Sequence, residues 1–459
     1  MKRRAPNHNG TNTPLGSVVH SKSVGEQKSR PLTSRGNRLV VCLALSMFAA
    51  SFALLLLQRD IQNVHSRQHQ IFLSKDLEAT RRGSFERDHT NTASTSKPST
   101  NTTRTHSSSV NPSSAAVASC AICFFGLPRS FQLLVLPSII QNVLKPNQKS
   151  TNRCDIYLHY YKIDSEGKSR SSAGGTIDTQ QVWLLTDAVN ELNRKRPDDN
   201  MDDEVYLSIV SDSEASFRKV RGEQLEKYMT TKGPDGKPLY YPWMAKSYDK
   251  HSIENMIKQW HSISQVFHAM EQGATTLNKN YTRVAMMRND VVYVTPFDIY
   301  QVSKTSRDND ANRQVVVPNF ARFPINDRMV YGPYDAVKIW ATERFDRLES
   351  HVRTYDEAGY GLHSERFLNH SIFPAIRELG YTVTTDPELC FFRARADGTA
   401  WINDCATRDG AAIGFRNLDR AQRLVEELVG HSCARSKYKQ RIVQVDCNGN
   451  STNKIAYSS

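Results

Sequence analysis

The side chains best suited to chemistry follow short apolar runs of the sequence. The first cluster, Gly126-Leu127-Pro128-Arg129-Ser130, comes directly after the apolar run 121–125. Gly126 lets a ligand approach the backbone closely, and the guanidinium of Arg129 can bind a phosphate through two hydrogen bonds. The N-terminus of the helix expected after Ser130 also favours an anion. The cluster therefore predicts a phosphate site, or else an ordinary strand–helix turn with an arginine on the surface.

The second cluster is Arg288-Asn289-Asp290, which lies between the apolar runs RVAMM and VVYV. Because an isolated buried charge is costly, these residues must lie at a strand end or pair with one another. The carboxylate of Asp290 could hold a divalent cation, Mn²⁺ or Mg²⁺, with phosphates as further ligands. The alternative is a structural ion pair between Arg288 and Asp290. The position of the cluster favours the functional interpretation.

Two further clusters combine a carboxylate with cationic or polar neighbours. Asn326-Asp327-Arg328 precedes the run MVYGP, and His363-Ser364-Glu365 stands at the start of a predicted helix. A carboxylate in the first turn of a helix also complements the helix dipole. A capping role is therefore the alternative for His363 and Glu365.

Strands and helices alternate along the region from Ser119 onward. The runs that predict strands are Ala121–Phe125, Asp155–Tyr161, Tyr206–Val210, Arg283–Met287, Val315–Val317 and Tyr381–Thr385. The segments that predict helices are Phe131–Leu144, Gln180–Leu192, His251–Met270, Gly332–Leu348, Ser364–Leu379 and Leu418–Val429. The alternation is typical of an α/β domain whose mostly parallel sheet is covered by helices on both faces. Such sheets bind ligands at the carboxyl ends of their strands, where the clusters above are expected to lie.

The N-terminal part of the 459-residue chain predicts a membrane anchor. Residues 39–57 carry no charge and as a helix would span roughly 28 Å, close to the hydrocarbon core of a bilayer. Over half of the net charge of +13 lies in residues 1–38, so we expect a cytosolic basic tail rather than a nucleic-acid partner. A cleaved signal peptide and a mitochondrial transit peptide are the alternatives. The Ser/Thr-rich segment 58–118 predicts a disordered stem.

The domain expected over residues 119–459 carries features of a secretory compartment. The N-glycosylation acceptors past the anchor are Asn101, Asn280, Asn369 and Asn450. In the Cys-containing C-terminal part, 390–459, disulfides between Cys390 and Cys405 and between Cys433 and Cys447 are reasonable expectations, although spacing does not fix connectivity. The Cys120-Ala-Ile-Cys123 spacing runs into an apolar strand with no partner motif, which argues against a zinc or redox site.

Several segments together resemble a known family. In order along residues 120–379 they are CFFGLPRSF, CDIYLHYY, ENMIKQWHSI, RVAMMRNDVVYVTPFDI, NDRMVYG and HSERFL. They are similar to glycosyltransferase-like proteins of the GT-A, nucleotide-diphospho-sugar transferase, class. The resemblance implies an α/β/α sandwich with a nucleotide-sugar site at the strand ends.

The resemblance also implies roles for individual residues. Asp290 would match the acidic motif, usually Asp-x-Asp, that binds the metal and the donor diphosphate. The first Asp of that motif is replaced by Arg288, which could itself neutralise diphosphate, so a strict dependence on Mn²⁺ does not follow. Asn326, Asp327 and Arg328 would lie near the donor sugar or the acceptor. Asp327 and Glu365 would be the candidate catalytic residues, with Glu365 as a base.

The layout of tail, anchor, stem and luminal domain is that of Golgi type II membrane glycosyltransferases. The leading hypothesis is therefore an enzyme that moves a sugar from a nucleotide-diphosphate donor to a hydroxyl of a glycan or glycoprotein. A luminal sulfotransferase is a second possibility, because GLPRS resembles the start of a phosphosulfate loop, although Phe131-Gln132 stands where that loop continues with Gly-Thr. The third is a lectin or pseudoenzyme that keeps the fold without turnover.

Overall fold

The computed structural model covers most of the predicted luminal domain. The residues that it describes are 119–148, 153–168, 173–194, 204–234, 236–240, 250–301, 311–354, 362–405, 411–430, 433–437 and 442–445. The predicted tail, anchor and stem lie outside these residues, as do Asn101, Asn450 and Cys447. Among the described helices, none combines the length and the apolar character needed to cross a bilayer.

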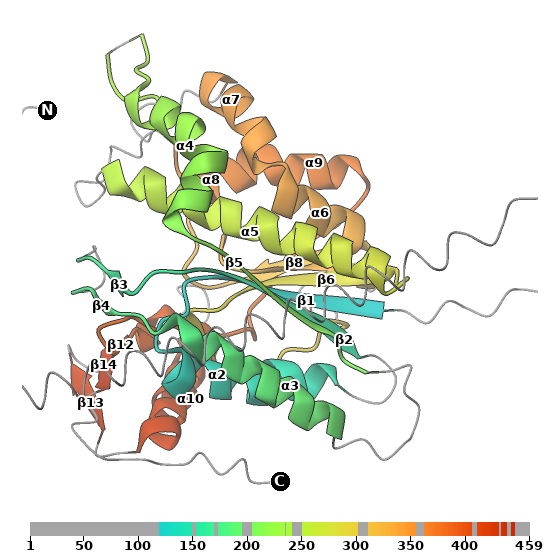
Figure 1. Ribbon diagram of the computed structural model, residues 1–459, viewed down its shortest axis with the longest axis vertical. Coiled ribbons are helices and arrows are strands. Elements are labelled where there is room, and N and C mark those ends of the chain that lie inside the picture. Colours follow the sequence, from blue (N-terminus) through green and yellow to red (C-terminus); the bar gives the residue numbers. More distant parts are fainter. Residues whose placement is uncertain are drawn as a thin grey trace, which may run out of the picture. The chain divides into compact units, whose positions relative to one another are not determined.

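A seven-stranded sheet forms the centre of the described region (Figure 1). Its strands, in spatial order, are β10 (Thr382–Asp386), β8 (Gln314–Pro318), β9 (Val330–Pro333), β6 (Tyr281–Arg288), β1 (Ser119–Gly126), β2 (Cys154–Tyr161) and β5 (Leu207–Asp212). All neighbours pair in parallel except β9, which is antiparallel to β6 and β8. The predicted α/β class with a mostly parallel sheet is confirmed.

Strand β1 shows why these segments form the middle of a sheet. Cys120, Ile122 and Phe124 point into one hydrophobic core, while Ala121 and Cys123 point into the other. All five side chains are fully buried. A near-continuous apolar run is the expected sequence of a strand that is covered on both faces.

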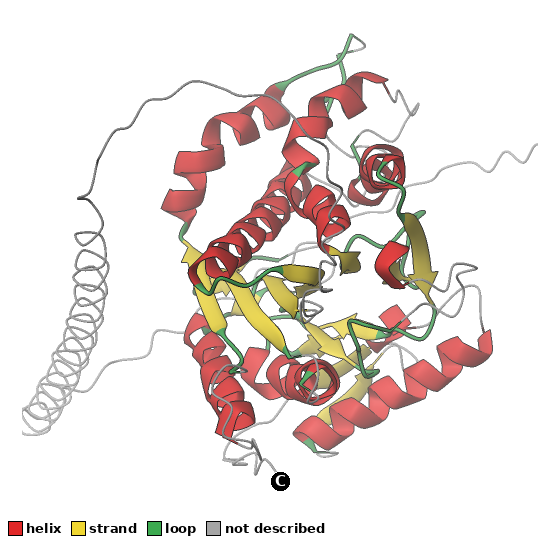
Figure 2. Cartoon of the chain, turned by 90° about the vertical axis from the view of Figure 1, so that its right-hand side faces the viewer, coloured by secondary structure: helices red, strands yellow, loops and turns green. Residues whose placement is uncertain are grey.

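Helices cover both faces, as the views in Figures 1 and 2 show. On one face lie α4 (Glu214–Thr230), α5 (Lys250–Thr276), α6 (Tyr334–Thr342), α7 (Arg344–Thr354), α8 (Ser364–Phe367) and α9 (Phe373–Glu378). On the other lie α2 (Leu136–Ile139), flanked by the π-helical turns η1 (Phe131–Val135) and η2 (Ile140–Leu144), α3 (Leu184–Arg194) and α10 (Ala411–Val429). The long helix α5 buries the predicted apolar stripe, including Ile257, Trp260 and Phe267, against the sheet.

Short elements complete the described region. The small strands are β3 (Ser165–Glu166), β4 (Gly175–Thr176), β7 (Val291–Tyr293), β11 (Phe391–Arg393), β12 (Thr399–Ala400), β13 (Ala434–Lys437) and β14 (Ile442–Val445). The short helical turns are η3 (Lys145–Asn147), η4 (Thr179–Trp183), η6 (Ala311–Arg313), η7 (Leu368–Ile372) and η8 (Ile402–Cys405). Strand β11 pairs with β7 in an antiparallel ladder, which brings the segment after Cys390 beside the segment after Arg288.

One predicted boundary needs correction, and one helix was not predicted. Gly332 and Pro333 were expected to open a helix, but they end strand β9, and the helix begins at Tyr334. Gly332 packs where a Cβ atom would lie 2.7 Å from the carbonyl oxygen of Gln314, so the close approach of β8 explains this glycine. Helix α4 was not predicted because few of its residues are apolar, although Ser213 and Ser216 form a capping box at its start.

The cysteines divide between confirmed and unexpected pairs. The disulfide between Cys390 and Cys405 is confirmed. Cys120 is bonded to Cys154 on the neighbouring strand β2, a pair that the sequence did not suggest. Cys433 is disulfide-bonded, and its expected partner lies outside the described residues. Cys123 is a buried free thiol.

Candidate functional site

A cavity of about 1310 Å³ lies at the carboxyl ends of the parallel strands. Of the predicted site residues, those that line it are Gly126, Arg129, Arg288, Asp327, Arg328, His363 and Glu365. Residues that are far apart in the sequence thus meet at one edge of the sheet. This agrees with the strand-end rule, by which open α/β sheets bind ligands at the carboxyl ends of their strands. A second cavity of about 570 Å³ lies beside α3 and β5 and has few charged residues in its wall.

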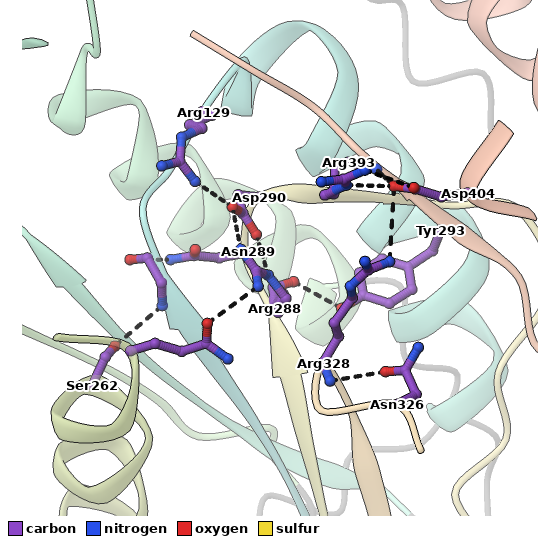
Figure 3. Close-up of polar contacts among 12 residues, drawn as sticks. Arg129, Ser262, Arg288, Asn289, Asp290, Tyr293, Asn326, Arg328, Arg393 and Asp404 are labelled. Atoms are coloured by element: carbon purple, nitrogen blue, oxygen red, sulfur yellow. Dashed lines mark hydrogen bonds and ion pairs between the residues drawn. The ribbon is translucent and has the colours of Figure 1, made fainter. Parts of the chain in front are cut away.

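The carboxylate of Asp290 is fully buried and is held by two arginines (Figure 3). Arg288 Nε lies 2.6 Å from Asp290 Oδ1, and Arg288 Nη2 lies 2.7 Å from Asp290 Oδ2. Arg129 Nη1 donates to Asp290 Oδ2 at 2.5 Å, while its Nε donates to Glu166 at 2.6 Å. Burial would raise the pKa of Asp290, but the charge and hydrogen bonds of Arg288 outweigh burial and hold that pKa well below its usual range.

This arrangement does not fit a divalent cation on Asp290. Both carboxylate oxygens already accept hydrogen bonds from guanidinium groups, and the side chain is not exposed to the cavity. Within the described part of the chain, no three His, Cys, Asp or Glu side chains cluster closely enough to hold a metal ion. The ion pair between Arg288 and Asp290, the alternative interpretation of the sequence, is the arrangement that the structure shows.

The segment after Cys390 contributes residues to the cavity wall that the sequence analysis did not predict. The backbone N–H of Ala394 donates to the carbonyl of Asp290 at 3.0 Å, which places Arg393 and Arg395 in the wall of the cavity. Arg393 binds Asp404 through its Nε and Nη2 atoms at 2.6 and 2.8 Å. The alternation of arginine and alanine directly after the apolar run Phe391–Phe392 was the available signal.

Positive charge is concentrated on this side of the cavity. Burial and the neighbouring Arg393 and Arg129 lower the pKa of Arg395 to about 9. Burial also lowers the pKa of Arg328, whose Nη1 atom lies 3.8 Å from Asp404 Oδ2. The positive charges of neighbouring guanidinium groups repel one another. A bound anion would offset this repulsion and so stabilise the cluster.

Comparison with known proteins adds no assignment to this geometry. The chain matches no protein-family model and no curated protein.

Two predicted site residues shape the wall without lining the cavity. Asn326 is fully buried: its Nδ2 donates to the carbonyl of Phe320, and its Oδ1 accepts from the backbone N–H of Arg328, both at 2.8 Å. Ser130 donates through its hydroxyl to the carbonyl of Arg395 at 2.9 Å. Both residues fix the backbone of arginine-bearing segments, which is a role in positioning rather than in contact with a ligand.

The candidate acidic residues both reach the cavity. Asp327 is half-buried, and within the described part of the chain its carboxylate makes no hydrogen bond or ion pair. Its charge acts on Arg288, Arg328 and Arg344, whose positive charges it stabilises. Glu365 stands in the first turn of α8, and His363 is the N-cap residue, although its side chain forms no capping hydrogen bond.

A buried polar chain supports the floor of the cavity under Gly126. The backbone N–H of Gly126 donates to Ser262 Oγ at 3.1 Å, and Ser262 Oγ lies 2.7 Å from His159 Nδ1. Asp212 Oδ2 then contacts His159 Nε2 at 3.1 Å and His261 Nε2 at 2.9 Å. Ser262 is fully buried, so this order of serine, histidine and aspartate fixes the strand end rather than presenting a nucleophile.

Gly126 itself is required at its position. Its φ angle of 117° lies in the region that favours glycine, and a Cβ atom there would lie 3.0 Å from Asn289 Oδ1. The backbone N–H of Asn289 donates to the carbonyl of Phe125 at 3.0 Å. The ends of β1 and β6 are thereby locked together, with Arg129 and Arg288 on either side.

The two predicted glycosylation acceptors within the described residues differ in accessibility. Asn280 is exposed between α5 and β6. Asn369 is half-buried in the helical turn η7, and the hydroxyl of its sequon residue Ser371 lies 2.9 Å from His351 Nδ1.

Proposed function

We propose that the chain is a glycosyltransferase that moves a sugar from a nucleotide-diphosphate donor to a hydroxyl of a glycan or glycoprotein. The observation that carries the proposal is the set of arginines around Asp290 and Asp404 in a large cavity at the strand ends. A diphosphate leaving group develops negative charge as its bond to the sugar breaks. Preorganised guanidinium groups stabilise that charge in the transition state.

Asp327 is the residue best placed to accept the proton of the attacking hydroxyl. Its carboxylate lies in the cavity wall without a hydrogen bond to the described residues, so it remains available to a substrate. Proton transfer to a positioned carboxylate assists an inverting displacement. Glu365, on the same wall, is the second candidate base.

The cavity can hold both substrates of such a reaction. Its volume of about 1310 Å³ exceeds the range of roughly 300–1,000 Å³ that is usual for sites of drug-sized ligands. The aromatic ring of Phe323, 44% exposed, stands in the cavity wall with its centroid 5.4 Å from that of the His363 ring. The arginines suit the donor diphosphate, and the exposed ring of Phe323 suits a sugar ring.

Location in a secretory membrane belongs to the same proposal. It rests on the charge-free segment 39–57, the basic tail before it and the exposed acceptor Asn280. The catalytic domain would then face the lumen of the Golgi or of another secretory compartment.

The proposal is tested by a thermal-shift screen of the full-length chain in mild detergent. The ligands are nucleoside-diphosphate sugars and phosphoadenosine phosphosulfate. A ligand at a hundred times its dissociation constant stabilises the fold by about 2.7 kcal/mol, and we expect this for at least one nucleotide sugar. Stabilisation by phosphoadenosine phosphosulfate alone would select the sulfotransferase hypothesis. Binding of a nucleotide sugar without transfer or hydrolysis would select the pseudoenzyme.

A further inference from the structure

Arg288, which replaces the first Asp of the acidic motif, uses most of its five N–H donors within the chain. Arg288 uses Nε and Nη2 on Asp290, and its Nη1 lies 3.5 Å from Gln259 Oε1. The hydroxyl of Tyr293 donates to its backbone carbonyl at 2.7 Å. Arg288 is therefore an internal counter-ion that neutralises Asp290 from within the chain.

A divalent cation would have to displace this counter-ion. A cation that bridges a protein carboxylate and a diphosphate needs free oxygens on the carboxylate. Both oxygens of Asp290 already accept hydrogen bonds from arginines, and the side chain is fully buried. Moving Arg288 aside would leave a guanidinium without its carboxylate partner. Because an unpaired buried charge is costly, the exchange of Arg288 for a cation is unfavourable.

Three other guanidinium groups in the cavity wall retain donors for a ligand. A guanidinium has five N–H donors. Arg393 uses two of its side-chain nitrogens on Asp404, and Arg129 binds Glu166 and Asp290, which leaves N–H groups on both. The side chain of Arg328 donates no hydrogen bond within the described residues, and its nearest carboxylate is 3.8 Å away.

These three arginines come from separate segments of the chain. Arg129 follows β1, Arg328 precedes β9 and Arg393 ends β11, so they approach the cavity from three segments of the chain (Figure 3). Asp404 connects two of them, since it binds Arg393 directly and lies near Arg328. A planar guanidinium binds phosphate oxygens through two N–H groups, and a diphosphate offers oxygens of two phosphates to arginines that come from different segments.

We propose that the donor diphosphate binds without a divalent cation, on the N–H groups of Arg129, Arg328 and Arg393. This inference rests on the proposed function, since it concerns how the donor of that reaction is held. Arg328 is the main ligand of the diphosphate because its side chain donates no hydrogen bond within the described residues and has only a long contact with Asp404. Arg129 and Arg393 are oriented by their carboxylate partners and complete the site.

The test is calorimetric titration of the full-length protein with uridine and guanosine diphosphate. One series contains a chelator, and a second contains Mn²⁺ in excess. We expect the dissociation constants of the nucleotide that binds to agree within about twofold between the series. Binding that appears only with Mn²⁺ would overturn this inference and leave the proposed function intact. Titrations that show no binding of either nucleotide, with or without Mn²⁺, and a failed screen against nucleotide sugars would overturn both.

Variants of Arg328 separate a ligand-binding role from a structural one. Arg328→Met should weaken nucleoside-diphosphate binding in chelator by at least tenfold, while the melting temperature of the ligand-free protein stays equal or rises. The matched control is Arg347→Met, since Arg347 lies on α7 and pairs with Glu343 outside the cavity wall. If Arg328→Met does not fold, Arg129→Lys serves instead, because lysine keeps the charge but loses the two-point contact. Unchanged affinity in a folded Arg328→Met protein would refute the assignment.

Discussion

Both carboxylate oxygens of Asp290 accept hydrogen bonds from Arg288, two residues earlier in the chain. Arg288 ends β6, Asp290 lies in the turn before β7, and the Asp290 side chain is fully buried. A buried ion pair stabilises a fold only weakly, but removing one partner strands the other charge away from water. The pair therefore decides whether this corner of the cavity forms at all.

Replacement of Asp290 tests that relationship. Asp290→Asn should lower the free energy of unfolding by about 3–5 kcal/mol, because Arg288 loses its buried counter-ion. Urea denaturation of the two proteins measures the change. The double variant Arg288→Met/Asp290→Leu removes both charges and should recover much of the loss. An Asp290→Asn protein with an unchanged urea midpoint would show that the ion pair does not contribute to the stability of the fold.

Replacement of Asp327 tests its proposed role as the base, and the expected effect is on the rate of transfer, not on folding. Asp327→Asn should reduce the rate of transfer by roughly 10²–10⁴-fold, the usual contribution of a general base. Donor affinity should hold or increase slightly, because the change removes a negative charge beside Arg328 and Arg288. The control is Asp335→Asn, an exposed carboxylate in the first turn of α6. Turnover that survives Asp327→Asn but fails in Glu365→Gln would move the base to Glu365.

The sequence predicted the parts of the fold that depend on local apolar pattern. The predicted strands, from Ala121–Phe125 to Tyr381–Thr385, all lie within or overlap observed strands. The inner strands β1, β2 and β6 are buried almost throughout and show long apolar runs. Strand β9 was missed because Gly332-Pro333 has the appearance of a helix start, and a close approach between neighbouring strands leaves no local signal.

The site was predicted in part for the same reason. Residues directly after predicted strands, such as Arg129 and Arg288, could be placed at the cavity from the strand-end rule alone. Arg393, Arg395 and Asp404 could not, because the antiparallel pairing of β11 with β7 joins segments about a hundred residues apart. That pairing also brings Arg395 close enough for its charge to act on Asp290.

The disulfide between Cys390 and Cys405 holds the segment that carries Arg393 and Arg395. Replacing both cysteines by serine should weaken nucleoside-diphosphate binding several-fold, since the arginines lose a fixed backbone. Removing a cross-link over a sequence separation of 15 should also cost roughly 3 kcal/mol of stability. The control is Cys120→Ser/Cys154→Ser, which opens a disulfide between β1 and β2 outside the cavity wall. It should lower stability but leave affinity unchanged. Equal losses of affinity in both double variants would contradict a local role for the first disulfide.

We expect His351 to make the stability of the fold depend on pH. Its ring is buried, with Nδ1 2.9 Å from Ser371 Oγ, and burial together with the nearby His370 lowers its pKa to about 4. The unfolded chain then binds a proton more readily than the folded one, so stability falls as pH drops from about 6.5 towards 4 and levels off below. The full loss attributable to this residue is about 3 kcal/mol.

A variant separates His351 from other histidines. His351→Gln should remove part of the slope seen in melting temperatures between pH 7 and pH 4.5. Some slope should remain, because burial also lowers the pKa of His261 beside Asp212. A variant with the full slope of the parent protein would show that His351 protonates as freely in the folded state as in the unfolded one.

The exposure of Asn280 gives the last prediction, which concerns the side of the membrane on which the domain lies. Asn280 is accessible at the start of β6, whereas Asn369 sits half-buried in a helical turn whose Ser371 hydroxyl is engaged by His351. In a secretory cell, we expect a glycosidase-sensitive mobility shift that Asn280→Gln reduces more than Asn369→Gln does. Protease added to intact vesicles should leave the domain uncut, because positive-inside orientation places residues after the anchor in the lumen. If protease removes the domain from intact vesicles and the domain carries no glycan, the domain lies in the cytosol. The secretory part of the proposed function would then be wrong. The arginine site could still be tested by titration.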